Sequence, residues 1–499
     1  MAWNTSFLPV TSRDSRLSLI RRRMAISRPK IIKFVNILTP SFTHTLWQDD
    51  ISSQTAQPSS GERASDHGRT DYLDGLRGLA AFVVYIYHFL LPFDPTVGLG
   101  YNPQKPDTTS FMGLPILALL RSGTAMVRIF FGISGYVLTL SASKALHRGD
   151  GEAVLRSLSA AALKRGFRLF LPAVVTGFVI MLLVHAGLYT DASTISHFPA
   201  HWHPLRPVRH DSFFTQISDW LDFTLGRLTN PWRWSRDLFA DLSASYYGAH
   251  LWTIQTEYHC SMILFLVAMI LSRASEPRIR SVLWAIITVY VCLCDRWDVG
   301  MFLCGMAFAD RDVQSNVAMS PETSIKPHWL QSGRRSRYLV SLAHTGILIA
   351  GLWLASYPER HGVDAIGFGA LNFISHSTEA WQSIGAAMIV WSVGRLSLVR
   401  AFLTNTLVGY LGQLSFALYL VHEPILQAFG WLYTGMLRKY FILAGPQLGF
   451  SEEFGAQVGM GFAFLSLSGV VIIIADYIWR WVDTPSLILA RKIGRLCIL

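Results

Sequence analysis

Long apolar stretches alternate with short polar ones along the chain from about residue 71 onwards. An apolar run of roughly 20 residues is long enough to cross a lipid bilayer as a helix. About ten runs are predicted to do so, although several fall short of that length. They are Asp71–Pro92, Ala125–Ser143, Leu169–Leu188, His250–Leu271, Val282–Cys294, Val299–Ala309, Tyr338–Ser356, Trp381–Val393, Leu407–Leu432 and Val458–Trp481. The pattern therefore predicts an all-α fold, a polytopic integral membrane helical bundle.

Lys and Arg are unevenly distributed between the polar loops. The basic loops alternate with others, and they are Ala142–Arg168, Ser272–Ser281, Asp310–Arg337 and Gly394–Thr404. The loop Pro358–Glu379, on the opposite side of the predicted membrane, has one Arg against three acidic residues. Because basic loops stay in the cytosol, this distribution predicts that both termini are cytosolic.

Three polar segments lie outside the predicted spans. Residues 1–70 are polar and basic, which predicts a disordered cytosolic tail before a membrane domain at residues 71–486. Residues 487–499 are predicted to be a short basic cytosolic tail. Residues 189–245 are predicted to form a long extracytosolic loop. Its His201-x-His203 pair indicates a solvated loop rather than a metal site, since no partner ligands follow at a suitable spacing.

The composition supports a membrane protein and excludes other classes. Hydrophobic residues make up 51% and charged residues 15% of the chain, whereas soluble domains have about 25% charged residues. The net charge of +11 arises mainly from residues between the apolar segments, so no nucleic-acid partner is expected. The five cysteines show neither a metal-ligand spacing nor a disulfide pattern, and no metal is predicted.

The first predicted helix contains two ionisable side chains, Arg77 and His88, within an apolar run. Their separation of eleven residues corresponds to about 1100°, roughly 20° beyond three full turns, so both point the same way. They are about 16 Å apart along the helix axis, which places Arg77 near one interface and His88 near the middle of the bilayer. Ionisable groups inside a membrane are costly and indicate a functional site.

Six short segments combine charged, aromatic and small residues in a distinctive order. They are Asp74–Gly78 followed by His88, Phe130–Leu138, Lys164-Arg165-x-x-Arg168-x-x-x-Pro172, Leu251–Glu257, Leu411–Pro424 and Asp483-x-Pro485. Together they resemble the membrane-bound acyltransferase 3 family over Tyr72–Ser486. The resemblance implies an enzyme that transfers an acyl group from acyl-CoA to a hydroxyl of a sugar or small molecule.

His88 is the expected general base, because a neutral imidazole accepts a proton from a hydroxyl. The alternative is a buried histidine hydrogen-bonded between helices. Arg77 stays protonated, so it is expected to bind a CoA phosphate or to stabilise the oxyanion formed when the thioester is attacked. The alternative for Arg77 is an anchor at the membrane interface.

The resemblance further implies a set of residues that bind acyl-CoA: Arg128, Ser134, Lys164, Arg165 and Arg168. Guanidinium groups bind phosphates through paired hydrogen bonds, although basic residues at the entry of a helix also act as cytosolic anchors. Ser134 precedes Gly135, and small residues let membrane helices approach closely. That packing role is the alternative to lining the thioester.

Glu257 lies within a predicted span, where a carboxylate needs a partner. The candidates are His88, Arg77 and Arg128, so Glu257 either orients His88 or pairs with an arginine. In a later helix, His422-Glu423-Pro424 lacks the spacing of a zinc motif. Pocket lining and helix capping are both open for that segment.

These observations predict a membrane O-acyltransferase with His88, Arg77 and Glu257 in its catalytic site. Acetyl-CoA is the expected co-substrate, entering from the cytosol, and no bound cofactor is expected. The expected acceptor is a small-molecule hydroxyl in terpenoid or polyketide biosynthesis, as in fungal-type members of the family. The expected location is the endoplasmic reticulum or another internal membrane. An O-acetyltransferase acting on a carbohydrate or glycan and a multi-span transporter are the alternatives.

Overall fold

The computed structural model describes residues 40–41, 61–105, 108–189, 207–234, 247–274, 276–318, 334–360 and 362–497. Within these ranges the regular structure is helical, apart from one isolated bridge between Leu99 and Arg360, which confirms the all-α prediction. The chain divides into two compact units, Met1–Arg63 and Ala64–Leu499, and the features below belong to the second. Most of the predicted tail at residues 1–70, and the His201-x-His203 pair, lie outside the described residues.

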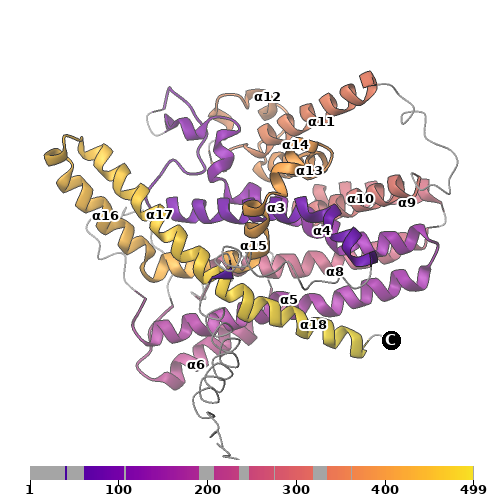
Figure 1. The fold of residues 1–499 in the computed structure, drawn as a ribbon, viewed down its shortest axis with the longest axis horizontal. Helices are drawn as coiled ribbons and strands as arrows, with labels where there is room; N and C mark the ends of the chain where they lie inside the picture. Colours follow the sequence, from indigo (N-terminus) through magenta and orange to yellow (C-terminus); the bar gives the residue numbers. More distant parts are fainter. Residues whose placement is uncertain are drawn as a thin grey trace, which may run out of the picture. The chain divides into compact units, whose positions relative to one another are not determined.

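The second unit is a bundle of helices (Figure 1). Its main helices are α3 (Gly61–Leu90), α4 (Gly123–His147), α5 (Gly151–His185), α6 (Phe213–Leu221), α8 (Trp252–Ser272), α9 (Pro277–Leu293), α10 (Trp297–Ala318), α11 (Arg334–Ala355), α13 (Thr378–Val393), α14 (Ser397–Leu403), α15 (Thr406–Ile425), α16 (Trp431–Ala444), α17 (Glu452–Ile478) and α18 (Thr484–Cys497). A short helix, α12, covers Gly369–Asn372. Helix α4 packs against α5, α8, α10 and α13, while α15 packs against α17.

In the described part of the chain, six helical stretches are long and apolar enough to cross a membrane. They are Thr70–Leu90, Gly123–His147, Gly151–His185, Ala249–Ser272, Tyr338–Ala355 and Glu452–Cys497. The helices α13 and α14, bent by 96° relative to each other, raise the number to seven if they form one span. The molecule is therefore a helical membrane protein. The larger number of spans and the cytosolic position of both termini remain predictions.

The segment Ala142–Arg168, predicted to be a loop between two spans, is instead mostly helical, and its cytosolic position remains a prediction. Only a short turn separates α4 from α5, and the Asp150 side chain caps α5 by accepting a hydrogen bond from the Ala153 amide at 2.9 Å. Lys, Arg and Glu are good helix formers, so both helices continue beyond their apolar residues. Most basic residues of this segment consequently lie within α5, among them Lys164, Arg165 and Arg168, whereas Lys144 lies in the last turn of α4.

Three other predicted bounds also differ from the structure. Helix α3 begins upstream of Asp71, and α18 continues the last span through most of the tail predicted at 487–499. The predicted span Leu407–Leu432 is divided into α15 and α16 by a π-helical turn at Leu426–Gly430. Hydropathy does not detect these ends for two reasons. Polar residues can extend a helix beyond its apolar part, and a π turn made of apolar residues interrupts a helix without a change in hydropathy.

Glycines bring α3 and α15 into close contact. A Cβ atom on Gly78 would lie 2.3 Å from the amide nitrogen of Gly412, and one on Gly412 would lie 2.5 Å from the Asp74 carbonyl oxygen. Small residues permit such an approach between membrane helices. The approach sets the side chains of Arg77 and His88 against α15, and both contact it.

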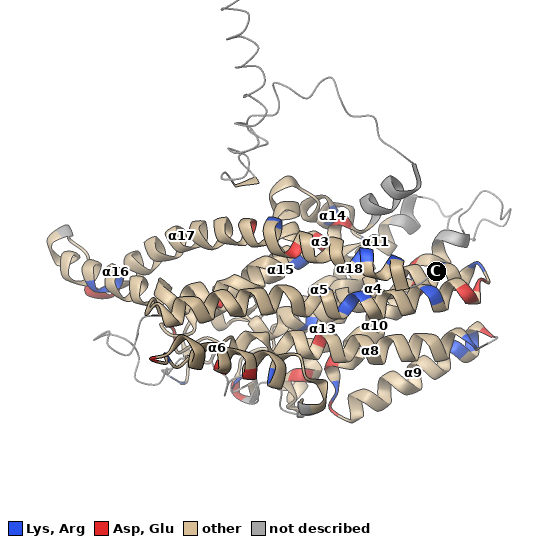
Figure 2. Cartoon of the chain, turned by 90° about the horizontal axis from the view of Figure 1, so that it is seen from below, with Lys and Arg blue, Asp and Glu red and all other residues tan. Residues whose placement is uncertain are grey.

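Lys and Arg gather at one end of the bundle, where α18 ends and where α8 turns into α9 (Figure 2). The same helices carry few charges along their middle sections. Basic helix ends are typical of the cytosolic face of a membrane protein. This end is referred to below as the basic end.

Candidate active site

A cavity of about 1600 Å³ lies between α3, α4, α8 and α15. Its ionisable side chains come from segments far apart in the sequence and include His88, Arg128, His250 and Glu423. Aromatic residues form much of the remaining wall, among them Tyr87, Phe131, Trp234, Trp252, Trp297 and Trp431. A concave apolar surface with a few converging polar groups is typical of an active site.

His88 contacts a second histidine, His422. Nδ1 of His88 lies 2.9 Å from the Val84 carbonyl oxygen and 3.3 Å from Nε2 of His422. A carbonyl oxygen only accepts hydrogen bonds, so we assign the proton of neutral His88 to Nδ1 and the lone pair to Nε2. Nδ1 of His422 lies 3.1 Å from the Leu418 carbonyl oxygen, which leaves its Nε2 as an acceptor for His88. The pair therefore holds His88 in a tautomer with a basic Nε2.

A third histidine, His250, is paired with Glu423. Nδ1 of His250 lies 2.7 Å from Oε2 of Glu423, and the two side chains are 2% and 9% exposed. The same carboxylate accepts hydrogen bonds from the His250 amide at 3.1 Å and from Nε2 of Gln427 at 2.8 Å. The His250 and His422 rings meet with their centroids 5.4 Å apart. Three histidines and one carboxylate thus form a continuous group, called here the histidine cluster.

Arg77 lies outside the cavity. Its guanidinium donates hydrogen bonds to the Ser415 hydroxyl at 2.8 Å and to the Gly412 carbonyl oxygen at 3.3 Å. It also pairs with Asp74 at 3.0 Å. Arg77 is therefore fixed between α3 and α15, away from the wall where His88 lies.

The predicted common orientation of Arg77 and His88 is confirmed, since both side chains contact α15. Within the apolar stretch Thr70–Leu90, Arg77 lies about two turns after the start and His88 lies close to the end. Their depths in the membrane remain predictions.

Glu257 pairs with Arg165, at 2.6 Å between Oε2 and the guanidinium. Arg165 also donates a hydrogen bond to Ser261, one turn further along α8, at 3.0 Å. The prediction that Glu257 contacts His88, Arg77 or Arg128 is therefore wrong. Glu257 lies on the side of α8 that contacts α5, so it neutralises a buried arginine and does not orient the base.

The residues predicted to bind acyl-CoA divide between two places. Arg128 lines the cavity. The other four predicted residues do not line it, and they are Ser134, Lys164, Arg165 and Arg168. Arg168 lies within electrostatic reach of Arg77 and of Asp483. Arg77, Arg165 and Arg168 thus form a second group of cations, called here the arginine cluster. Lys164 directly precedes Arg165 on α5, and its side chain lies next to Gly494 of α18.

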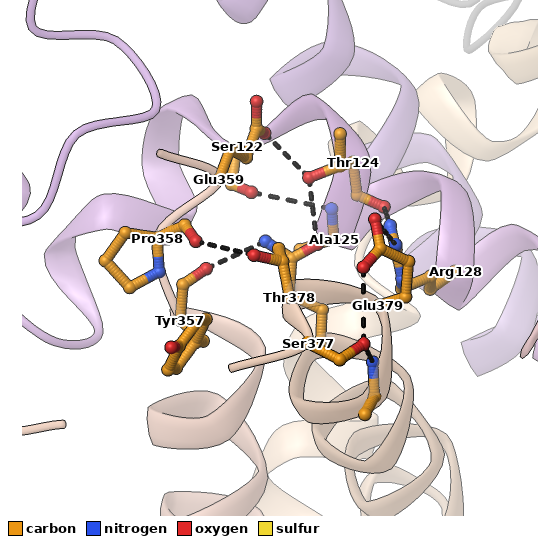
Figure 3. Close-up of polar contacts among 12 residues, drawn as sticks. Ser122, Thr124, Ala125, Arg128, Tyr357, Pro358, Glu359, Ser377, Thr378 and Glu379 are labelled. Atoms are coloured by element: carbon orange, nitrogen blue, oxygen red, sulfur yellow. Dashed lines mark hydrogen bonds and ion pairs between the residues drawn. The ribbon is translucent and has the colours of Figure 1, made fainter. Parts of the chain in front are cut away.

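Arg128 lies among polar side chains from the starts of α4 and α13 and from the segment after α11 (Figure 3). It donates a hydrogen bond to the Thr124 carbonyl oxygen at 3.0 Å, and its ion pair with Glu379 is long, at 3.9 Å. The Thr124 hydroxyl donates to Glu359 at 2.6 Å. Since Glu359 and Glu379 also line the cavity, this part of its wall carries both signs of charge.

Another charged pair, Arg296 and Asp298, lines the cavity at the start of α10. The guanidinium donates two hydrogen bonds to the carboxylate, at 2.9 and 2.6 Å. The hydrogen bond with Asp298 raises the pKa of Arg296. Burial would raise the pKa of Asp298, but the hydrogen bond and charge of Arg296 outweigh burial and lower it. Both groups are therefore ionised near neutral pH.

Ser134 and Gly135 lie where α4 packs against α10. A Cβ atom on Gly135 would lie 2.1 Å from the Phe302 carbonyl oxygen, so this glycine permits the close approach of the two helices.

No three His, Cys, Asp or Glu side chains are arranged to hold a metal ion in the part of the chain that the structure describes.

The sequence indicated some of these residues and missed others. His88 and Arg128 were predicted to be functional, and His422-Glu423 was noted with two open roles. His250 was missed, although it directly precedes the segment Leu251–Glu257, because no local pattern distinguishes it. Its partner is 173 positions away, and only the fold brings the two together.

A cavity with a paired, oriented histidine fits an enzyme that activates a hydroxyl or a similar nucleophile. Comparison with known proteins identifies the class. The profile described as an acyltransferase domain matches residues 70–480. The chain therefore belongs to the acyltransferase 3 family, as the sequence motifs predicted, and it is an acyltransferase.

Three fungal acyltransferases are similar to the chain over most of their own lengths. O-acetyltransferase PaAT-1 of Phomopsis amygdali is 26% identical over 452 residues, which cover 86% of this chain and 84% of the relative. Acyltransferase R4 of a Phoma species is 24% identical over 468 residues, or 86% and 96% of the two chains. Acyltransferase clz18 of Cochliobolus lunatus is 22% identical over 461 residues, or 83% and 94%. No solved structure matches the chain significantly.

Proposed function

We propose that the chain transfers an acetyl group from acetyl-CoA to a hydroxyl of a small molecule. The observation that carries the proposal is the contact between His88 and His422 at the cavity wall, because it leaves a basic nitrogen on His88. The similarity to a named O-acetyltransferase supports acetyl as the transferred group.

His88 acts as the general base. Its Nε2 accepts the proton of the acceptor hydroxyl while the oxygen attacks the thioester carbonyl, and a positioned base of this kind accelerates proton transfer by about 100- to 10,000-fold. His422 accepts the Nδ1 hydrogen bond of His88 and so keeps the ring in the reactive orientation. Transfer is direct, because no side chain is required to carry the acyl group.

Two members of the arginine cluster, Arg77 and Arg168, bind the phosphate end of the donor. Arg77 and His88 are about 16 Å apart along α3, and CoA carries its phosphates and its thioester at opposite ends of a long arm. Arg77 and Arg168 therefore suit the nucleotide phosphates, while the arm extends toward the cavity. Of the two roles left open for Arg77, we propose phosphate binding, and the position of Arg77 outside the cavity lining supports it.

The cavity accommodates an acceptor larger than a simple alcohol. Its volume of about 1600 Å³ exceeds the roughly 300–1,000 Å³ of a typical small-molecule site. Aromatic side chains such as Phe131, Trp252 and Trp431 suit a multi-ring apolar molecule that partitions into the bilayer. A terpenoid or polyketide hydroxyl in an internal membrane is thus the proposed acceptor, and the reaction is a tailoring step in its biosynthesis.

Labelled acetyl-CoA tests the donor and the acceptor class together. Membranes that contain the protein are incubated with labelled acetyl-CoA and a metabolite extract from cells that lack it. We expect one apolar metabolite to gain the label and the mass of one acetyl group. Membranes carrying His344→Ala, a change on α11 outside the cavity, should give the same product. Label that appears on carbohydrate, or on no metabolite, would contradict the proposed acceptor.

A further inference from the structure

The proposed reaction leaves one requirement without a residue. When a hydroxyl attacks a thioester, negative charge develops on the carbonyl oxygen, and a fixed hydrogen-bond donor is needed to stabilise it. Arg77 lies outside the cavity, and Arg165 is occupied by Glu257 and Ser261. The donor must therefore come from the wall of the cavity near His88.

His250 lies beside a buried carboxylate, Glu423. Glu423 is buried, and a buried carboxylate is stable only when it is paired and hydrogen-bonded. Nδ1 of His250 lies 2.7 Å from that carboxylate, while the amide of His250 and the side chain of Gln427 supply its other hydrogen bonds. A carboxylate only accepts hydrogen bonds, so the contact requires a hydrogen on Nδ1, and the proposal below places a second one on Nε2.

The other ring nitrogen of His250 has no such partner. Both ring nitrogens are buried and neither makes an aligned hydrogen bond among the described residues, but Nδ1 has the Glu423 carboxylate as a charged neighbour. Its surroundings are ordered: the Tyr419 hydroxyl donates a hydrogen bond to the His250 carbonyl oxygen and accepts one from Thr253 at 2.6 Å. A buried polar atom without a partner costs stability, so it requires an explanation such as a catalytic role.

We propose that Nε2 of His250 donates a hydrogen bond to the thioester carbonyl oxygen and stabilises the oxyanion. His250 lines the same cavity as His88, and both rings contact His422, with centroids 5.4 and 4.9 Å from it. The base and the oxyanion donor thus share one histidine neighbour. The inference rests on the proposed function and adds a catalytic residue to it.

The step balances without a further reactant. The hydroxyl proton moves to Nε2 of His88 as the oxygen–carbon bond forms and the carbonyl electron pair moves to oxygen, next to His250. When the carbonyl re-forms, the carbon–sulfur bond breaks and the CoA thiolate takes the proton back from His88. His250 keeps its proton throughout, and Glu423 keeps its charge.

Two readouts in purified protein test the inference. The first is the turnover number for CoA release from acetyl-CoA, with acceptor or with water as the nucleophile. The second is inhibition by S-ethyl-CoA, which keeps the phosphates and the arm but lacks the carbonyl oxygen. His250→Leu removes the donor, and Glu423→Gln retains His250 without its carboxylate.

We expect His250→Leu to lower turnover by about 100- to 1,000-fold, the usual cost of one oxyanion donor. Inhibition by S-ethyl-CoA should stay within about threefold of wild type, because that compound offers no carbonyl oxygen. Glu423→Gln should also lower turnover. If His250→Leu does not fold, Glu423→Gln tests the inference by itself.

The outcomes separate this inference from the proposed function. Turnover within threefold of wild type in both variants would overturn the role of His250. An equal loss of turnover and of S-ethyl-CoA inhibition would also overturn it, because it would indicate a structural role. If wild-type protein neither releases CoA nor is bound by S-ethyl-CoA, the proposed function itself fails, and the inference with it.

Discussion

Nε2 of His422 lies 3.3 Å from Nδ1 of His88, across two helices whose residues are 334 positions apart. Each ring also has its Nδ1 close to a carbonyl oxygen of its own helix. The two histidines therefore share one tautomer, and the chain of hydrogen bonds ends at a basic nitrogen on His88.

His422→Phe should lower turnover without weakening donor binding. The ring shape is preserved, but one of the two acceptors near the Nδ1 hydrogen of His88 is lost and the Val84 carbonyl oxygen alone remains, so His88 is less well oriented. Misplacement of a reacting group costs up to about 100-fold in rate. We expect a loss of that order in kcat, with the KM for acetyl-CoA within threefold of wild type. A large rise in KM with unchanged kcat would instead show that His422 binds substrate.

Arg77→Ala should weaken donor binding through the phosphates alone. KM for acetyl-CoA should rise by at least tenfold, since a charged hydrogen bond contributes about 1.5–3 kcal/mol. Activity on S-acetylpantetheine, which lacks the nucleotide phosphates, should be unchanged. Arg156→Ala is the matched control, because Arg156 is an exposed arginine on the same basic end, paired with Glu152. Equal losses on both donors would contradict phosphate binding by Arg77.

The pair of Glu257 and Arg165 should matter for stability more than for chemistry. Glu257→Leu leaves a buried arginine without its counter-charge, which typically costs about 3–5 kcal/mol. Replacement of both residues by apolar ones, Glu257→Leu with Arg165→Met, should recover most of the loss. Thermal unfolding in detergent measures both. If the double variant is no more stable than Glu257→Leu, the two residues are not a pair.

Gly78→Ala should separate α3 from α15. The new Cβ would lie 2.3 Å from the Gly412 amide nitrogen, so the helices must move apart and the contact of Arg77 with Ser415 is lost. Overpacking of this kind costs about 1–3 kcal/mol. Gly409→Ala is the control on α15, since nothing lies within 4 Å of its Cβ position. Equal melting temperatures for the two variants would contradict the close packing described for α3 and α15.

The sequence alone was sufficient to predict features that depend on a single helix. The spacing of Arg77 and His88 follows from helical periodicity alone, and both side chains do contact the same neighbouring helix. The all-α fold and the membrane location follow from the apolar segments. The family follows from six short motifs.

The sequence alone was insufficient to predict contacts that depend on how the helices pack against one another. Glu257 needs a partner, but which arginine it meets depends on the face of α8 that contacts α5. The pairing of His250 with Glu423 depends on where α15 ends relative to the start of α8. The loop at Ala142–Arg168 was predicted from hydropathy. Hydropathy indicates which residues prefer lipid to water, but it does not indicate where a helix ends.

The central claim is that His88 is the general base of direct acyl transfer. The most direct test compares the turnover of purified wild-type protein, His88→Ala and His88→Gln with acetyl-CoA and the acceptor, with inhibition by S-ethyl-CoA as the measure of an intact donor site. We predict that both variants lose at least about 100-fold in kcat, as expected for a missing general base, while S-ethyl-CoA binds as before. A kcat for His88→Ala within threefold of wild type would contradict the account.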